Sequence, residues 1–297
     1  MTDEFLTLNK LKELLKKEGI KPNKILGQHF LIDRNVRDKI IDFAQLNPDD
    51  IVIEIGSGLG EITEGIAKQV KKVYGFEKDP HIADILKKRL AEKENVEIII
   101  KDFLDMEESF FKNIAVNNNI KIIGNLPYYI ASPILFNLLK FRNYWNLALV
   151  SLPQEVSKKI IAVSGEKDFG FMAVLFSLYT QTRICYKLGK TIFYPMPKVT
   201  SVFLSIKPLK TPSVFIPDEK MFWEIIPTLF LYKRKTIQNV LGKTWKINKN
   251  DLKTILEKSD INPLLRSHQL NLDQMIKLVN TYKPLTTKNK NIIIHNK

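Results

Sequence analysis

The stretch that decides the fold is Ile51-Val52-Ile53-Glu54-Ile55-Gly56-Ser57-Gly58-Leu59-Gly60. A short run rich in β-branched residues passes directly into alternating glycines, and a helical pattern follows over residues 61–70. A glycine-rich turn between a strand and a helix is where an α/β sheet binds a nucleotide-like cofactor. Because the spacing departs from Gly-x-Gly-x-x-Gly, we expect the turn to press against a nucleoside rather than a pyrophosphate. The structural alternative is a tight turn that needs positive φ.

Outward from this turn, short apolar runs alternate with helical patterns. Strands are predicted over residues 51–55, 73–76, 96–100, 120–123 and 147–150, and helices over 61–70, 81–91, 133–141 and 154–163. This alternation predicts an α/β fold, a Rossmann-like and mostly parallel sheet covered on both faces. Two late strands, over residues 182–186 and 199–206, are expected at an edge. Ligands of such sheets bind at the carboxyl ends of the strands.

The two ends of the chain differ from this centre. Leucines at helical spacing predict a short amphipathic helix over residues 8–15, and a basic loop and a second helix, 34–45, follow it. Prolines at 208, 212 and 217 predict a linker. Beyond it, helical patterns are predicted over residues 221–232, 235–241, 252–258 and 273–280. We therefore predict a first domain over residues 1–210, an all-helical domain over 211–282 and a disordered tail over 283–297.

Composition narrows the class of protein. The chain has 297 residues, enough for a full core and a second small domain. Its 46 Lys and Arg against 32 Asp and Glu give a net charge of +14, which favours a polyanionic partner such as nucleic acid. The bland alternative is a lysine-rich composition without functional meaning. Cys185 is the only cysteine, which excludes an internal disulfide and a multi-cysteine metal site, and we expect no metal. With no secretory signal and no apolar run near the ~18 residues that span a bilayer, we expect a cytoplasmic protein without membrane contact.

Two carboxylates end consecutive predicted strands after the glycine turn. Glu77 closes the second strand, where a carboxylate can accept both hydroxyls of a ribose. Asp102 follows the third strand, placed to hydrogen-bond an adenine amine. Either could be an ordinary solvated loop acid. Their occurrence at successive strand ends favours a nucleoside site.

The fourth strand ends in Asn125-Leu126-Pro127-Tyr128. An exocyclic amine on a base is a poor nucleophile because its lone pair is delocalised into the ring. The Asn125 side-chain oxygen and the Leu126 carbonyl can accept its two hydrogens and aim the lone pair, while Pro127 fixes the backbone. Tyr128 offers a face on which the base stacks. Positioning then supplies much of the rate, without a deep general base. The alternative is a proline turn with aromatic packing.

Five segments together resemble one known family, the small-subunit ribosomal RNA adenine N6,N6-dimethyltransferases. Lys24–Leu31 resembles its N-terminal cofactor-gating motif, residues 54–60 its S-adenosylmethionine turn, and Asn125–Tyr128 its amine-presenting motif. Phe193–Ser201 resembles the late loop whose Phe stacks on the target adenine, and Phe230–Thr236 the basic signature that opens the helical domain.

The resemblance implies a monomeric enzyme with a methyltransferase sheet that uses S-adenosylmethionine in ribosome biogenesis. Its implied substrate is small-subunit (16S) rRNA, dimethylated at two adjacent adenosines in the 3′-terminal hairpin. The implied cofactor contacts are His29, Leu31, Gly56, Gly58, Glu77, Asp102 and Asn125. The implied catalytic residues are Asn125, Leu126, Pro127, Tyr128 and Phe193, and the implied RNA contacts are Lys233, Arg234 and Lys235. His29 departs from the pattern, since Asn is also common there and a ring nitrogen must replace an amide.

Two other functions stay open at this point. The large-subunit adenine methylase that confers macrolide resistance shares the cofactor turn and the amine motif. The signature at residues 233–236 and the long helical tail favour the small-subunit enzyme. A noncatalytic RNA-binding assembly factor is the third possibility. The intact Asn125-x-Pro127-Tyr128 motif and both strand-end acids argue for retained catalysis.

Overall fold

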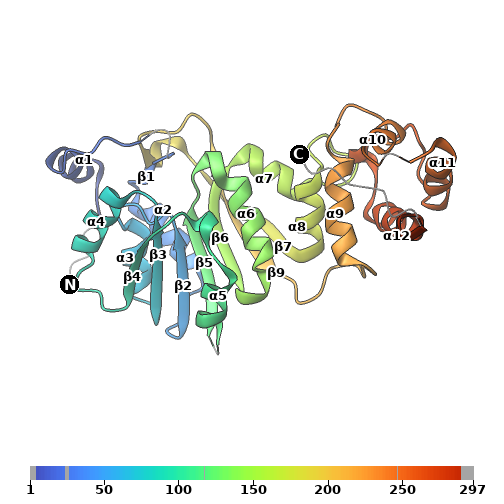
Figure 1. The fold of residues 1–297 in the computed structure, drawn as a ribbon. Helices are drawn as coiled ribbons and strands as arrows, with labels where there is room; N and C mark the ends of the chain where they lie inside the picture. The colour runs from blue at the N-terminus through green and yellow to red at the C-terminus, as the bar shows by residue number, and fades with distance from the viewer. Residues whose placement is uncertain (1–4, 24–26, 117, 246, 289–297) are drawn as a thin grey trace. The chain divides into compact units, whose positions relative to one another are not determined.

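The protein is described by a computed structural model that covers residues 5–23, 27–116, 118–245 and 247–288. Its centre is a seven-stranded sheet in the order β4-β3-β2-β5-β6-β9-β7. The strands are β2 (Asp50–Ile55), β3 (Lys72–Glu77), β4 (Val96–Ile100), β5 (Asn119–Asn125), β6 (Leu147–Pro153), β7 (Thr180–Leu188) and β9 (Ser201–Pro208). The first five are parallel to one another, and β9 runs antiparallel to β6. The predicted α/β fold with a Rossmann-like sheet is confirmed (Figure 1).

Helices cover both faces of the sheet because successive strand residues point to opposite sides. On one face, α2 (Arg34–Ala44) and α3 (Glu61–Ala67) pack their apolar sides against strand residues that include Val52, Ile123 and Leu149. On the other face, Phe76 of β3 contacts Phe103 edge-on at 5.6 Å between ring centroids. That aromatic cluster continues into α5 (Glu108–Ala115) through Phe111. The other helices of this unit are α4 (Pro80–Arg89) and α6 (Ala131–Lys140).

A two-stranded sheet brings distant parts of the sequence together beside the main one. β1 (Phe30–Leu31) pairs antiparallel with β8 (Phe193–Tyr194). Helix α1 (Leu8–Lys17) buries Leu11 and Leu15 in a cluster with Phe30 and Leu59. The N-terminal helix therefore packs against the segments that border the glycine turn.

The chain divides into two compact units. The first comprises residues 1–157 and 181–210, and the second residues 158–180 and 211–297. The second unit contains α8 (Phe171–Tyr179), α9 (Glu219–Leu229), α10 (Ile237–Thr244), α11 (Lys249–Lys258) and α12 (Leu272–Lys288); α7 (Gln154–Ile161) crosses the boundary. Packing thus assigns residues 158–180 to the helical unit, in addition to the predicted 211–282. Residues 289–297 of the predicted tail lie outside the described residues, and α12 occupies its first part.

No helix in the described part of the chain is both long and apolar enough to cross a bilayer.

Candidate functional site

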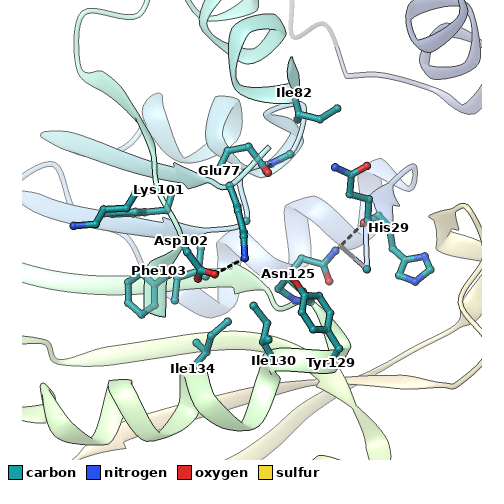
Figure 2. Close-up of a pocket in the computed structure, with 18 of the residues that line it drawn as sticks. His29, Glu77, Ile82, Lys101, Asp102, Phe103, Asn125, Tyr129, Ile130 and Ile134 are labelled. Atoms are coloured by element: carbon teal, nitrogen blue, oxygen red, sulfur yellow. Dashed lines mark hydrogen bonds and ion pairs between the residues drawn. The ribbon is translucent and has the colours of Figure 1, made fainter. Parts of the chain in front are cut away.

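Parallel pairing aligns the carboxyl ends of four adjacent strands. Ile55 of β2 is paired with Phe76 of β3 and with Gly124 of β5, and Glu77 is paired with Ile100 of β4. The residues that follow these positions therefore meet at one edge of the sheet. They are Gly56 after β2, Glu77 at the end of β3, Asp102 after β4 and Asn125 at the end of β5. The sequence-predicted contacts from four separate strands are brought together (Figure 2).

The glycine turn needs its glycines. Gly56, Gly58 and Gly60 have φ values of 73°, 55° and 92°, in the left-handed region that other residues avoid. The amides of Gly56 and Ser57 both donate to the Phe76 carbonyl, at 2.9 and 3.1 Å, and so fasten the turn to β3. A Cβ at Gly60 would lie 2.5 Å from a methyl carbon of Leu86, so this glycine also allows α3 to start close to α4.

Glu77 is held in place by backbone amides. One carboxylate oxygen accepts from the Gly58 amide at 2.9 Å and the other from the Asp79 amide at 2.9 Å. Burial raises the pKa of Glu77, and these two hydrogen bonds work in the opposite direction. The Glu77 carboxylate is thus hydrogen-bonded to the glycine turn, and each holds the other in place. A carboxylate fixed in this way keeps lone pairs available for the hydroxyls of a ribose.

Asp102 has a partner that the sequence analysis did not assign. Lys78 Nζ lies 2.7 Å from Asp102 Oδ2, and the Leu104 amide donates to Oδ1 at 2.9 Å. Partial burial raises the pKa of Asp102, but the hydrogen bonds from Lys78 and Leu104 outweigh it and leave the pKa lowered. The carboxylate is therefore ionised at neutral pH and can accept a hydrogen from an adenine amine. Lys78 lines the same cavity as Asp102.

These groups line a cavity whose empty volume, open solvent included, is about 720 Å³. Figure 2 shows Glu77, Asp102 and Asn125 converging on it. Its apolar lining is supplied by Phe30, Ile55, Phe76, Ile82, Phe103, Ile130 and Ile134. The combination of polar groups with an apolar lining suits a nucleoside, whose sugar needs hydrogen bonds and whose base needs apolar contact.

Asn125 is oriented from both sides. Its Nδ2 donates to the His29 carbonyl oxygen at 2.9 Å, and its Oδ1 accepts from the Ser151 hydroxyl. An amide oxygen has two lone pairs, so Oδ1 can accept a second hydrogen. Next to it, the Leu126 amide donates to the Ser151 carbonyl at 3.1 Å, which fixes the start of the motif. Asn125 lines the main cavity and also a small neighbouring one.

His29 and Tyr128 support each other beside Asn125. Their rings are 5.3 Å apart between centroids, at an angle of 32°. His29 Nδ1 donates to the Pro195 carbonyl at 2.6 Å, and Figure 2 shows the ring pointing away from Glu77 and Asp102. The Tyr128 hydroxyl is hydrogen-bonded to the Ser201 hydroxyl, and burial raises its pKa. His29 therefore reaches Asn125 through its backbone carbonyl rather than through a ring nitrogen.

Leu31 and Phe193 lie elsewhere. They face each other in the β1–β8 pair, are 5% and 4% exposed, and belong to the core cluster on the α2 side of the sheet. Neither lines the main cavity. Both line the smaller cavity, whose empty volume is about 190 Å³ and which also contacts Asn125 and Ser151. The stacking role of Phe193 stays a prediction. Of the gating motif, residues 24–26 lie outside the described residues.

Comparisons with known proteins identify the family of this chain. The sequence profile described as ribosomal RNA adenine dimethylase matches residues 19–283. The ribosomal RNA small subunit methyltransferase A of Halothermothrix orenii is 34% identical over 273 residues, 91% of each chain. The protein of the same name from Bacillus cytotoxicus is 35% identical over 286 residues, covering 95% of this chain and 98% of that one. The chain belongs to the ribosomal RNA adenine dimethylase family.

Membership of the ribosomal RNA adenine dimethylase family confirms the predicted enzyme class, an rRNA adenine dimethyltransferase, and its methyl donor, S-adenosylmethionine. Solved structures support the fold. A dimethyladenosine transferase from Plasmodium falciparum aligns over 90% of this chain and 100% of that one, with a TM-score of 0.69 and 24% identity. The 23S rRNA methyltransferase ErmE aligns over 86% of this chain and 99% of that one, with a TM-score of 0.62 and 21% identity.

The three residues predicted to contact RNA have different surroundings in the structure. All three are exposed and lie between α9 and α10. Lys233 and Arg234 line a cavity within the helical unit. Lys235 instead places its Nζ over the Tyr232 ring at 5.6 Å, and Lys243 Nζ lies over the same ring at 4.3 Å.

Sequence reasoning missed two functional neighbours. Ser151 was not singled out, although it is the one side-chain hydroxyl in the otherwise apolar strand β6 and is paired in register with Asn125. Gln28 lies in the Lys24–Leu31 segment, and the sequence predicts no role for it. Its Nε2 donates to Asp79 at 2.8 Å, and its Oε1 accepts from the Asn23 amide at 2.7 Å, which ties the gating segment to the residue after Lys78.

Proposed function

We propose that this enzyme dimethylates N6 of two adjacent adenosines in the 3′-terminal hairpin of small-subunit (16S) rRNA. The observation that carries the proposal is the placement of Asn125, at the end of β5, on the wall of the cavity that Glu77 and Asp102 also line. A target amine brought to Asn125 is therefore adjacent to the bound methyl donor. The relatives that share about a third of their residues with this chain carry the small-subunit name.

The residues of the cavity fit S-adenosylmethionine. Gly56 and Gly58 have positive φ values, which favour glycine. Because glycine has no side chain, the backbone of this turn would approach the cofactor closely. Glu77 would accept from the ribose hydroxyls and Asp102 from the adenine amine, and the apolar lining would hold the base between them. When bound, the cofactor supplies an electrophilic methyl group.

The protein's own contribution is to prepare the amine. Asn125 Oδ1 and the Leu126 carbonyl accept its two hydrogens, which moves the nitrogen lone pair out of conjugation with the ring. Pro127, with φ −58° and ψ 126°, fixes the extended backbone that presents this carbonyl. The Tyr128 ring, immobilised by Ser201 and His29, offers a rigid face to the adenine. The base must leave its stack to reach this position.

We propose that residues 1–210 carry catalysis and residues 211–282 carry RNA binding. Lys233, Arg234 and Lys235 would bind rRNA phosphates, in keeping with the net charge of +14. Phe193 would complete the base site from the side of the small cavity that it shares with Asn125. We also propose that the protein acts as a monomer in the cytoplasm.

A methyl-transfer assay on purified ribosomal subunits tests the proposal. Small and large subunits that lack the modification are incubated with the protein and labelled S-adenosylmethionine, and the modified positions are identified by mass spectrometry. We expect label only in small subunits, as dimethyladenosine at two adjacent positions. Label in large subunits would favour the large-subunit methylase. Subunit binding without transfer would indicate an assembly factor. Asn125→Ala, which we expect to be inactive, is the negative control.

A further inference from the structure

A second large cavity lies entirely within the helical unit. Its empty volume, open solvent included, is about 780 Å³. It is lined by Lys167, Asp168, Phe169, Phe230, Lys233, Arg234, Arg266, Ser267 and His268. These residues come from three segments: the loop before α8, the turn between α9 and α10, and the 3-10 turn Ser267–Gln269 with the residue before it.

Hydrogen bonds to backbone carbonyls fix the three segments to one another. The Gly165 amide donates to the His268 carbonyl at 2.8 Å, which joins the first segment to the third. The Ile237 amide donates to the Leu265 carbonyl at 2.6 Å, and the Ser267 hydroxyl donates to the Leu229 carbonyl. The walls of the cavity are therefore formed before any ligand binds.

The lining is strongly cationic. Lys167, Lys233, Arg234 and Arg266 are all exposed, and Asp168 is the single carboxylate among the lining residues. Within the described part of the chain, none of these four cations forms an ion pair with a carboxylate. Four neighbouring positive charges without partners repel each other, and an anionic ligand would relieve that repulsion.

The cavity also has an aromatic wall, which a site for phosphate alone does not require. The rings of Phe169 and Phe230 meet edge-on, 6.2 Å apart at 74°. Phe169 is buried, while Phe230 is partly exposed. Leu231, the next residue after Phe230, is 61% exposed. Cations beside an exposed aromatic surface are the combination that binds single-stranded nucleic acid, through phosphates and stacked bases.

We infer that this cavity binds one unstacked nucleotide of a single-stranded RNA segment. Its base lies against Phe230, and the phosphates on either side of it contact the four cations of the lining, Lys167, Lys233, Arg234 and Arg266. The inference rests on the proposed function, which assigns Lys233 and Arg234 to rRNA phosphates. It adds Lys167 and Arg266 to the RNA contacts and predicts that a base, and not only the backbone, is held there.

The charge contribution is tested with two cavity residues that the proposed function does not use. Binding of a labelled short single-stranded RNA to the full-length protein is followed by fluorescence anisotropy across a range of salt. We expect Lys167→Gln/Arg266→Gln to raise the Kd at least tenfold and to lower the log–log salt slope by about 1.4, since each single-strand phosphate contributes about 0.7. Lys249→Gln/Lys258→Gln on α11 removes the same charge from outside the cavity and should change the Kd less than twofold. Equal losses in the two double variants would overturn the inference.

The base is tested with a matched RNA that carries one abasic position. The wild-type protein should bind the complete RNA at least about fivefold more tightly than the abasic RNA, the effect of losing one stacked base. Phe230→Leu, which keeps an apolar side chain against Phe169, should abolish this preference. Lys167→Gln/Arg266→Gln, whose aromatic wall is intact, should bind both RNAs more weakly but keep the preference, which separates the loss of the ring from the loss of charge. A preference that is absent in the wild type, or that persists in Phe230→Leu, would overturn the inference.

The two proposals fail separately. Asn125→Ala should keep the base preference of the wild type while it loses methyl transfer. If the wild-type protein methylates small subunits but shows no base preference, the cavity inference alone is wrong. If it shows the preference but does not methylate, the proposed function alone is wrong.

Discussion

The Ser151 hydroxyl donates a hydrogen bond to Oδ1 of Asn125, while Nδ2 of the same Asn125 donates to the His29 carbonyl at 2.9 Å. The amide is thus held at both ends before a target base arrives. This matters because an amide that rotates freely would present its NH₂ group as often as its oxygen to the incoming amine. Asn125 and Ser151 are paired in the parallel register of β5 and β6, so the fold itself sets this contact.

Asn125→Ala should lower kcat for methyl transfer by at least about a hundredfold, the loss expected when one preorganised polar contact to the reacting group is removed. Binding to the small subunit should stay within about twofold, because the substitution leaves the cationic residues of the helical unit unchanged. Single-turnover transfer and subunit binding, measured on the same preparation, check the prediction. Near-wild-type turnover would remove Asn125 from the mechanism.

Ser151→Ala should have a smaller effect of the same kind. It removes one hydrogen bond to an amide, worth about 1 kcal/mol, so we expect kcat to fall about fivefold with little change in KM for S-adenosylmethionine. Ser157→Ala is a matched control, because the Ser157 hydroxyl donates to the Gln154 carbonyl at the start of α7 and does not contact Asn125. An equal loss of kcat in the two variants would mean that Ser151 contributes only to general stability.

Glu77→Ala should weaken S-adenosylmethionine binding by about 1–3 kcal/mol, about fivefold to a hundredfold in Kd, because the ribose hydroxyls lose a charged acceptor. The Gly58 amide also loses its partner, so the glycine turn is less well ordered. Titration calorimetry with S-adenosylmethionine measures the effect. Glu97→Ala serves as the control, since this acid pairs with Lys72 and does not line the cavity. Unchanged affinity in Glu77→Ala would assign Glu77 a structural role.

The residues at the strand ends of this site could be predicted from the sequence, whereas most of the side chains that contact them could not. Gly56, Glu77, Asp102 and Asn125 were found because strand ends are readable from apolar runs, and parallel strands must bring those ends together. Contacts that depend on register were not readable. Ser151 contacts Asn125 only because of the register in which β5 and β6 pair. Lys78 lies 2.7 Å from Asp102 because the ends of β3 and β4 are side by side, and the sequence alone does not give that alignment.

The helical unit shows the same limit. Helix α8 (Phe171–Tyr179) was not predicted because it is apolar on nearly every side, so it has no polar face to reveal a helical period. The surroundings of Phe193 were not readable either. The resemblance implies that this ring belongs to the base site, which stays a prediction, but the sequence does not show that pairing of β8 with β1 packs the ring against Leu31. Which face of a ring stays open is decided by tertiary packing.

Glu54 gives the chain a pH-dependent stability. This residue of β2 is 2% exposed, and burial raises its pKa to about 8, although Thr63 donates a hydrogen bond to it. Below about pH 4.5 the carboxyl is protonated in the folded and the unfolded chain, so the raised pKa has no effect on stability. Between about pH 4.5 and 8 only the unfolded chain ionises, so stability falls as the pH rises.

Glu54→Gln should remove that dependence. The variant should match the wild type near pH 4.5 and exceed it increasingly up to about pH 8, by a few kcal/mol at most, given about 1.4 kcal/mol per pKa unit. Urea unfolding at a series of pH values measures the difference. Glu92→Gln, at an exposed position, should show no such trend. A constant difference between Glu54→Gln and the wild type across the range would contradict the buried, protonated state.

The last prediction separates the three cations that the sequence groups together. Lys233 and Arg234 line the cavity of the helical unit, whereas Lys235 is directed over Tyr232. If they bind rRNA phosphates, Lys233→Gln and Arg234→Gln should each weaken small-subunit binding and lower its log–log salt slope by somewhat under about one unit. Lys235→Gln should have the smallest effect of the three.

Replacing all three should leave S-adenosylmethionine affinity unchanged, because the strand ends that form the cofactor cavity belong to the other unit. The triple variant should therefore bind cofactor normally yet methylate small subunits poorly at moderate salt, and recover activity as salt is lowered. An unchanged salt slope would mean that these residues only solvate the turn before α10. The phosphate contacts would then have to come from other cations of the chain, such as Lys21 in the N-terminal loop.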